Sequence, residues 1–266
     1  MSSVYTGNLT VSIFGQSHAP AIGVTVDGLP AGLPVDPDEL QRFLSRRAPG
    51  QNAWSTPRRE ADAPEFLCGL KNGKTCGAPL TAIIRNTNTR SGDYENLKDI
   101  PRPGHADYAA WVRSGGHNDP RGGGAYSGRL TAPLVAAGAM VNAWLKEQDI
   151  ELKAQVIDEN ALRQQAAEAK AHGDSVGGEI ACTVTGLPAG LGGPGWREAV
   201  ESELARHLFA IPAVKALGFG DGAALAHMRG SRANDPLRTD GTRIRTVTNH
   251  NGGINGGVTN GMPLTF

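Results

Sequence analysis

Residues 25–33 read TVDGLPAGL, and residues 183–191 read TVTGLPAGL. Eight of these nine positions agree, and only Asp27 and Thr185 differ. Each copy follows a run of residues typical of a β-strand and is soon followed by a run typical of a helix. Chance reuse of a turn sequence would explain the match, but a duplicated strand–turn–helix unit explains it better. The repeat therefore predicts a pseudo-symmetric fold with two related sheets.

The segments around the repeat alternate between strand and helix patterns. One helix has a clear beginning, because Asp36 is a good capping residue and Pro37 suits the first helical position. We expect strands at residues 9–14, 22–26, 80–84 and 179–184, and helices at residues 37–47, 133–147, 161–172 and 197–208.

The composition favours a neutral protein rich in turns. Lys and Arg number 26, as do Asp and Glu, so the formal net charge is zero. A dedicated nucleic-acid-binding protein would usually be basic. Glycine contributes 36 residues and proline 17, together about a fifth of the chain, which is high for an ordinary domain. We therefore expect many tight turns and close approaches of the backbone.

Cysteine usage and hydropathy indicate a cytoplasmic, soluble protein. Cys68, Cys76 and Cys182 are an odd number and lack CxxC spacing, so neither a disulfide framework nor a metal site is expected. The N-terminus lacks a charged flank followed by an apolar run, and no stretch approaches the ~18 apolar residues of a membrane span.

The segment 102–132, RPGHADYAAWVRSGGHNDPRGGGAYSGRLTA, has the highest density of candidate anion-binding residues. It contains a triple glycine at 122–124, whose backbone N–H groups are suited to cradling phosphate. Its arginines, whose guanidinium groups bind carboxylate or phosphate in a fork, include Arg102 and Arg129. Glycines alone mostly mark turns, but together with His105 they predict an anion site.

Three further stretches each allow two interpretations. His18 in FGQSHAPAIG (14–23) follows a strand and suits proton transfer, but a structural or surface histidine is the alternative. Arg47 in RFLSRRAPG either points into a cleft or belongs to a solvated helix end. The glycines of TNHNGGINGGVTNGMP (248–263) form either surface turns or backbone packed against a flat cofactor.

Several motifs, in order along the chain, resemble those of chorismate synthases. They are FGQSH near the start, RRAPG, RRE at 58–60, RPGHADY, RGGG with Ser127 and Arg129, IPAVKALGFGDG at 211–222, MRGS and NGGINGG. Members of that family convert 5-enolpyruvylshikimate 3-phosphate to chorismate by a 1,4-anti-elimination of phosphate that requires reduced FMN. The resemblance implies a single α+β domain over residues 1–266, with helices sandwiched between two antiparallel sheets, and a homotetramer.

The resemblance also implies roles for individual residues. His18 resembles the histidine that protonates the reduced flavin, and His105 resembles the one that assists the departing phosphate. Three arginines correspond to ligands of the substrate's anionic groups: Arg47, Arg102 and Arg129. Three positions fall where the family contacts FMN: Ser127, Ala213 and Gly256.

The chain departs from the family pattern at several positions. These are Gln16 for Glu, Ala19 for Gly, Ala53 for a basic residue, Ala125 and Tyr126 for Arg-Ser, and Pro212 for Asn. The sequence ends at Phe266, before the family's Lys-Pro-Thr flavin loop and Arg-His-Asp-Pro motif. The resemblance therefore leads us to expect that the C-terminal part of the family fold is missing.

Two functions follow from the match and from these departures. The first is the lyase. The alternative is a truncated, inactive relative that binds flavin or substrate weakly or assembles with a complete copy. We expect the 266 residues alone not to turn over and, because a strand ends at Phe266, to aggregate or fold marginally. A general phosphate- or nucleic-acid-binding module is disfavoured, since aromatic residues are lacking beside the basic ones.

Overall fold

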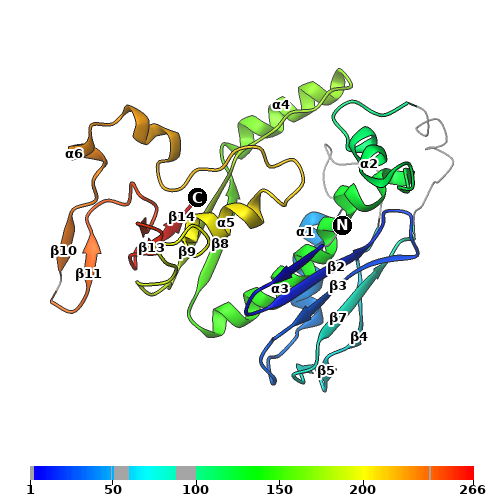
Figure 1. Cartoon of the computed structure of the whole chain (residues 1–266), viewed down its shortest axis with the longest axis horizontal. Helices are drawn as coiled ribbons and strands as arrows, with labels where there is room; N and C mark the ends of the chain where they lie inside the picture. Colours follow the sequence, from blue (N-terminus) through cyan, green and yellow to red (C-terminus); the bar gives the residue numbers. More distant parts are fainter. Residues whose placement is uncertain (1–2, 49, 51–59, 88–99, 240) are drawn as a thin grey trace. The chain divides into compact units, whose positions relative to one another are not determined.

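The chain forms two units that each combine helices with antiparallel sheets. The computed structural model describes residues 3–48, 50, 60–87, 100–239 and 241–266, and it divides into the units Met1–Trp144 and Leu145–Phe266. Figure 1 shows the two units, coloured from blue to green and from green to red. The α+β prediction is confirmed. The single domain over residues 1–266 and the packing of helices between two sheets stay predictions.

The first unit is built on a five-stranded antiparallel sheet. Its strands, in spatial order, are β1 (Val4–Thr6), β2 (Thr10–Gly15), β3 (Ala21–Asp27), β7 (Leu80–Arg85) and β4 (Pro64–Cys68). A short hairpin of β5 (Leu70–Lys71) and β6 (Lys74–Thr75) follows β4. The central strand β3 turns Ile22, Val24 and Val26 toward the core, where all three are buried, because alternate residues of a strand share one face.

Two helices pack on the apolar face of this sheet. Helix α1 (Pro37–Arg47) begins as predicted, since the Asp36 carboxylate accepts hydrogen bonds from the backbone of Asp38 and Glu39. Its Leu40 and Leu44 pack into the same core cluster as β3 and the alanine-rich helix α3 (Thr131–Glu147). A shorter helix, α2 (Asp107–Ser114), lies in the anion-binding segment.

The second unit contains a three-stranded antiparallel sheet. Strand β9 (Ile180–Thr185) lies between β8 (Glu151–Val156) and β14 (Leu264–Thr265). The helices of this unit are α4 (Glu159–Ala171), α5 (Val200–Leu208) and α6 (Gly230–Ala233), and its hairpins are β10–β11 (Leu237–Thr239, Ile244–Thr246) and β12–β13 (Ile254–Asn255, Val258–Thr259). Val184, Ile254 and Leu264 form its small core.

The predicted strands and helices are all present, with ends shifted by a few residues. The largest shift is at α5, which was expected from residue 197 and begins at Val200. The preceding residues form a turn instead, in which Glu198 accepts a hydrogen bond from Gly193 and Ala199 is extended. None of the described helices is long and apolar enough to cross a membrane.

The two copies of the repeat adopt the same local structure. Each begins at the end of a strand, β3 or β9, and is followed by a helix, α1 or α5. In each copy, a threonine from outside the repeat forms hydrogen bonds to the backbone of the turn. The Thr75 hydroxyl donates to the carbonyl of Pro30 at 2.6 Å and accepts from the backbone of Leu33 at 2.9 Å. The Thr259 hydroxyl makes the equivalent bonds to Pro188 at 2.7 Å and from Leu191 at 2.9 Å.

The duplication extends into the segments that carry these threonines. Residues 69–80 read GLKNGKTCGAPL and residues 253–264 read GINGGVTNGMPL. Both form a two-stranded hairpin and then enter a sheet strand. Leu80 pairs with Val26 and Leu264 pairs with Val184, the same positions of the two repeats. The predicted pseudo-symmetric fold with two related sheets is therefore confirmed at the level of strand pairing.

Replacing Thr75 or Thr259 by valine should lower the free energy of unfolding by about 1–3 kcal/mol, because two part-buried hydrogen bonds, each worth about 0.5–1.5 kcal/mol, are lost. Thr75 and Thr259 are 5% and 4% exposed, so we expect losses of similar size in urea unfolding. Thr185→Val, at the exposed end of β9, is the control and should change little. A large loss of stability in one of these two variants and none in the other would show that the two threonines are not equivalent.

Candidate functional site

The triple glycine allows the loop at 121–126 to lie directly on the turn between β2 and β3. Gly122, Gly123 and Gly124 have φ angles of 59°, 83° and 54°, a region that side chains disfavour. A Cβ atom at Gly122 would lie 2.4 Å from the His18 ring and 2.5 Å from the Ser17 hydroxyl. The backbone of Ser17 also donates to the carbonyl of Gly124 at 3.2 Å. The glycine loop thus packs against His18 without intervening side chains.

His18 is buried in this turn, with 8% of its surface exposed. Burial excludes the interpretation of His18 as a surface histidine. The turn is held by Asn86, which follows β7 and donates from Nδ2 to the carbonyls of Gln16 at 3.1 Å and Ala19 at 2.7 Å. The Asn86 amide oxygen lies 3.2 Å from Arg129 Nε, so it accepts from that guanidinium. Asn86 therefore connects the His18 turn to Arg129.

Arg129 is almost completely buried, with 7% of its surface exposed. Its Nε also lies 3.1 Å from Glu60 Oε2, and its Nη1 pairs with Asp62 Oδ1. Its Nη2 has no hydrogen-bond partner among the described residues. A buried guanidinium nitrogen without a partner costs free energy, so this nitrogen is suited to binding an anion.

Arg47 and Arg129 meet on one carboxylate. Asp62 Oδ2 accepts from Arg47 Nη1 at 2.5 Å, and Arg47 Nε donates to the Thr131 hydroxyl at 3.1 Å. Arg47 remains the last residue of α1 and bridges to the beginning of α3. The carboxylate that joins the two arginines lies in a segment with no regular secondary structure, which is why sequence patterns did not point to it.

Arg102 forms a two-pronged ion pair with Asp107. Its Nε and Nη2 each lie 2.8 Å from an oxygen of that carboxylate. The hydrogen bonds from the Arg102 side chain, opposed by burial, lower the pKa of Asp107 to about 2. The pair therefore stabilises the fold above the ordinary carboxylate pKa of about 3.9, and this contribution is lost as the pH falls toward 2.

This ion pair lies beside the glycine loop. A Cβ atom at Gly123 would be 3.9 Å from Arg102 Nη2 and 3.8 Å from Ser127 Cβ. The Ser127 hydroxyl accepts from the backbone of Arg129 at 3.3 Å. His105 is exposed in the turn between Arg102 and α2. The glycine loop thus lies against His18, Arg102 and Ser127. Arg129 is connected to the His18 turn through Asn86, and Arg47 is connected to Arg129 through Asp62.

The sequence analysis did not point to Asp119, a carboxylate close enough to His18 to interact with its charge. Asp119 pairs with the exposed Arg121 at 2.7 Å, and this hydrogen bonding is the main reason that the pKa of Asp119 is lowered. A charge on His18 lowers the pKa further. The carbonyl of Asp119 also lies against Gly124, so the residue belongs to the wall of the same site.

The other two predicted cofactor residues lie in the second unit. Ala213 has a φ of 70° and Gly256 a φ of 59°, and a Cβ atom at Gly256 would meet no described residue within 4 Å. The loop after Gly230–Ala233 is organised by Asp235, which accepts from Thr248, His250 and Asn251. Burial alone would raise the pKa of Asp235, but these hydrogen bonds lower it to about 2.

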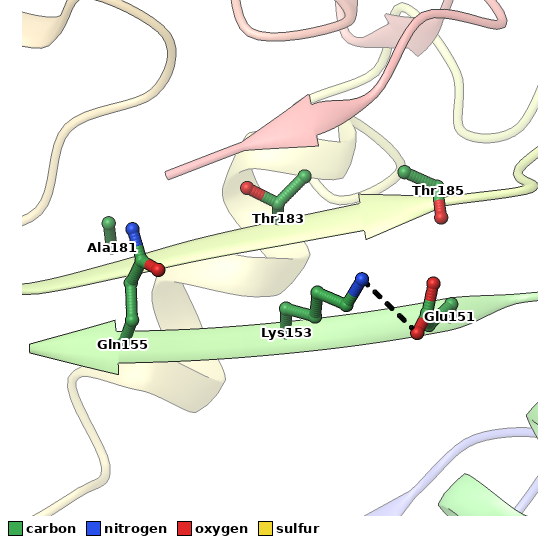
Figure 2. A pocket seen from close by; sticks show the side chains of 6 residues that line it. All are labelled: Glu151, Lys153, Gln155, Ala181, Thr183 and Thr185. Carbon is green, nitrogen blue, oxygen red and sulfur yellow. Dashed lines mark ion pairs between the residues drawn. The ribbon is translucent and has the colours of Figure 1, made fainter.

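A shallow depression of about 220 Å³ lies on the face of β8 and β9. Figure 2 shows its side chains, including an ion pair of 3.3 Å between Lys153 and Glu151. Strand β8 is exposed along its whole length. The depression is lined by none of the predicted site residues, but by Glu151, Lys153, Gln155, Ala181, Thr183 and Thr185. Its chemistry therefore does not mark it as the functional site.

Two predictions concern residues that the structure does not test. Arg58 and Arg59 of the RRE motif, and Ala53, lie outside the described residues, whereas Glu60 is described.

Within the described part of the chain, no group of three or more His, Cys, Asp or Glu side chains is placed to hold a metal ion.

Comparison with known proteins identifies the family. The family model described as chorismate synthase matches residues 9–266. The chain belongs to the chorismate synthase family. A chorismate synthase from Chitinophaga pinensis is 46% identical over 259 residues, which cover 96% of this chain and 76% of that protein. One from Aeropyrum pernix is 44% identical over 288 residues, which cover 96% of this chain and 75% of that protein.

A solved structure supports the same assignment. A chorismate synthase crystal structure superimposes with a TM-score of 0.79 at 26% identity, over 97% of this chain and 82% of that one. The resemblance seen in the sequence motifs is therefore confirmed, and the chain is a member of a family of shikimate-pathway lyases.

Proposed function

We propose that this member of the chorismate synthase family converts 5-enolpyruvylshikimate 3-phosphate to chorismate and phosphate by 1,4-anti-elimination, with reduced FMN as the cofactor. The observation that carries the proposal is the buried Arg129, whose Nη2 lacks a partner among the described residues and which is tied through Asn86 to the His18 turn. Family membership supports the substrate and the reaction.

The charges of the site suit this substrate. 5-Enolpyruvylshikimate 3-phosphate carries two carboxylates and a phosphate, so it requires several fixed cations. Arg129 and Arg47 are held on Asp62, and Arg102 is held on Asp107 beside the glycine loop. A guanidinium has five N–H donors and keeps some of them after pairing with one carboxylate. We assign the binding of the substrate's anionic groups to these three arginines.

The two histidines have separate roles in the proposal. The exposed His105, three residues after Arg102 in the chain, donates a proton to the phosphate oxygen as the carbon–oxygen bond breaks. His18 is buried against Gly122, so its proton is shielded from water and its ring is held in one orientation. We propose that His18 holds a proton beside the bound cofactor and can supply it there.

The positions assigned to FMN have backbone suited to a flat, anionic group. A Cβ atom at Gly256 would meet none of the described residues within 4 Å, and Ser127 Cβ lies beside the glycine loop, 3.8 Å from where a Cβ atom of Gly123 would stand. Ser127, Ala213 and Gly256 would hold the cofactor, which when bound supplies electron density to the elimination. From family membership we further propose a cytoplasmic homotetramer that acts on a small molecule, without nucleic-acid or membrane partners.

The test is anaerobic titration of reduced and oxidised FMN, with and without the substrate, followed by assay of phosphate and chorismate. We expect reduced FMN to bind roughly tenfold more tightly when substrate is present, because the coupling free energy between two bound ligands is typically about 1–3 kcal/mol. The Thr185→Val variant is the control and should behave as the parent. Reduced FMN that binds equally well with and without substrate would contradict an intact site.

A further inference from the structure

Asp62 differs in its surroundings from the other carboxylates of the site. Its side chain has no exposed surface, whereas Asp107 and Asp119 each pair with one arginine and keep some exposure. Its two oxygens bind different guanidinium groups: Oδ2 binds Arg47 at the end of α1, and Oδ1 binds Arg129 in the turn before α3. One carboxylate thus joins two elements that are distant in sequence.

The backbone around Asp62 is held in an uncommon conformation. Asp62 has a φ of 49°, which is unfavourable for most residues with a side chain. The preceding residue is anchored to α1, because Gln41 Nε2 donates to the carbonyl of Ala61 at 2.9 Å. The backbone that carries the buried carboxylate is therefore tied to α1.

The electrostatics explain why a shared carboxylate is needed. Two guanidinium groups close together in a buried site repel each other, and a carboxylate between them offsets this repulsion. A substrate anion would not replace Asp62, because the displaced carboxylate would stay buried without compensation, which is strongly unfavourable. Arg129 Nη2 is still without a partner among the described residues, so Asp62 leaves a donor for the substrate.

We propose that Asp62 is a positioning residue: it sets the spacing of Arg47 and Arg129 so that both guanidinium groups are prearranged for one anionic substrate. This role rests on the proposed function, since it presupposes that these arginines bind 5-enolpyruvylshikimate 3-phosphate. Prearrangement avoids the loss of side-chain entropy on binding. Asp62 therefore acts on substrate affinity without touching the substrate.

Two substitutions separate positioning from charge. Asp62→Asn keeps the shape but replaces one acceptor oxygen by a donor, so it can hold only one of the two arginines. Asp62→Glu keeps the charge but is longer by one methylene, so it shifts both arginines. We expect each variant to bind 5-enolpyruvylshikimate 3-phosphate roughly 10–100-fold more weakly than the parent, as for the loss of a charge-assisted contact.

The experiment is calorimetric titration of the full 266-residue chain with that substrate, under anaerobic conditions with reduced FMN. Glu65→Gln is the matched control, because Glu65 lies on the adjacent strand β4 in an exposed pair with Arg85, and its affinity should equal that of the parent. Phenylglyoxal labelling read by mass spectrometry should show Arg47 and Arg129 becoming more reactive in both Asp62 variants, but not in Glu65→Gln.

Each outcome decides the proposal. If the parent does not bind the substrate, the proposed function fails and this inference with it. If the parent binds and Asp62→Asn binds within twofold of it, the inference alone fails. Substrate affinity in Asp62→Glu equal to that of the parent would show that the charge alone suffices, and it would also overturn the positioning role of Asp62. Should Asp62→Asn not fold, Gln41→Ala loosens the same segment without changing a charge, and unchanged affinity in that variant would refute positioning.

Discussion

Replacing His18 or His105 by alanine should lower the turnover number by about 10²–10⁴-fold, the usual effect of removing a general acid. The expectation applies to a preparation whose parent chain forms chorismate. His105 is exposed beside the Arg102–Asp107 pair, so its loss should remove the proton donor with little effect on stability. His18 is buried under Gly122, so its loss should also leave a void.

The controls are two histidines on exposed helical segments of the second unit. His172 follows α4, where its ring lies 2.9 Å from the carbonyl of Glu168, and His207 lies on α5. Alanine at either position should leave the rate of chorismate formation near that of the parent. A near-parent rate for His105→Ala would remove it from the mechanism, and equal losses at all four histidines would indicate damage to folding instead.

Arg129→Ala should have the largest combined effect on stability and binding. It removes one of the two guanidinium groups on a carboxylate with no exposed surface, and breaking a buried pair costs about 3–5 kcal/mol. It also removes a charge-assisted contact with the substrate, worth roughly a factor of 10–100 in affinity. Urea unfolding and calorimetric titration with 5-enolpyruvylshikimate 3-phosphate measure the two effects separately.

Two variants sharpen this prediction. Arg129→Lys keeps the charge but cannot reach Asp62 and Glu60 as a fork, so both effects should be intermediate. Arg85→Ala, which removes the exposed pair with Glu65, should leave stability and affinity unchanged within error, because exposed pairs contribute little. Substrate affinity of Arg129→Ala equal to that of the parent would exclude a direct contact.

Much of the fold was predictable because its determinants are local. The helix at 37–47 was predicted at its observed ends, since Asp36 and Pro37 act on their immediate neighbours. The duplicated turns were recognisable because glycines with positive φ, such as Gly28 and Gly186, have few substitutes. Strand β8 was missed, since its alternating pattern ELKAQV carries charges and little hydrophobicity and therefore resembles an exposed segment.

The candidate site was predictable only in part. The triple glycine with neighbouring arginines and histidine indicated an anion site. Of the eight predicted residues, His18, Arg102 and Ser127 lie against that loop, and Arg129 and Arg47 are connected to it through Asn86 and Asp62. The partners that hold them were not indicated. Asn86 connects two loops through hydrogen bonds to residues far away in sequence, and nothing in the residues around position 86 points to such a role.

The sequence by itself determined the family, the duplicated unit and the glycine loop, because ordered motifs and backbone conformations are written in neighbouring residues. Only the tertiary structure decided that Arg47 and Arg129 meet on Asp62. That carboxylate lies 67 residues from Arg129 along the chain, and a long arginine side chain can reach many partners. Burial selects among them, since a charge removed from water is tolerated only where the fold supplies its counter-charge.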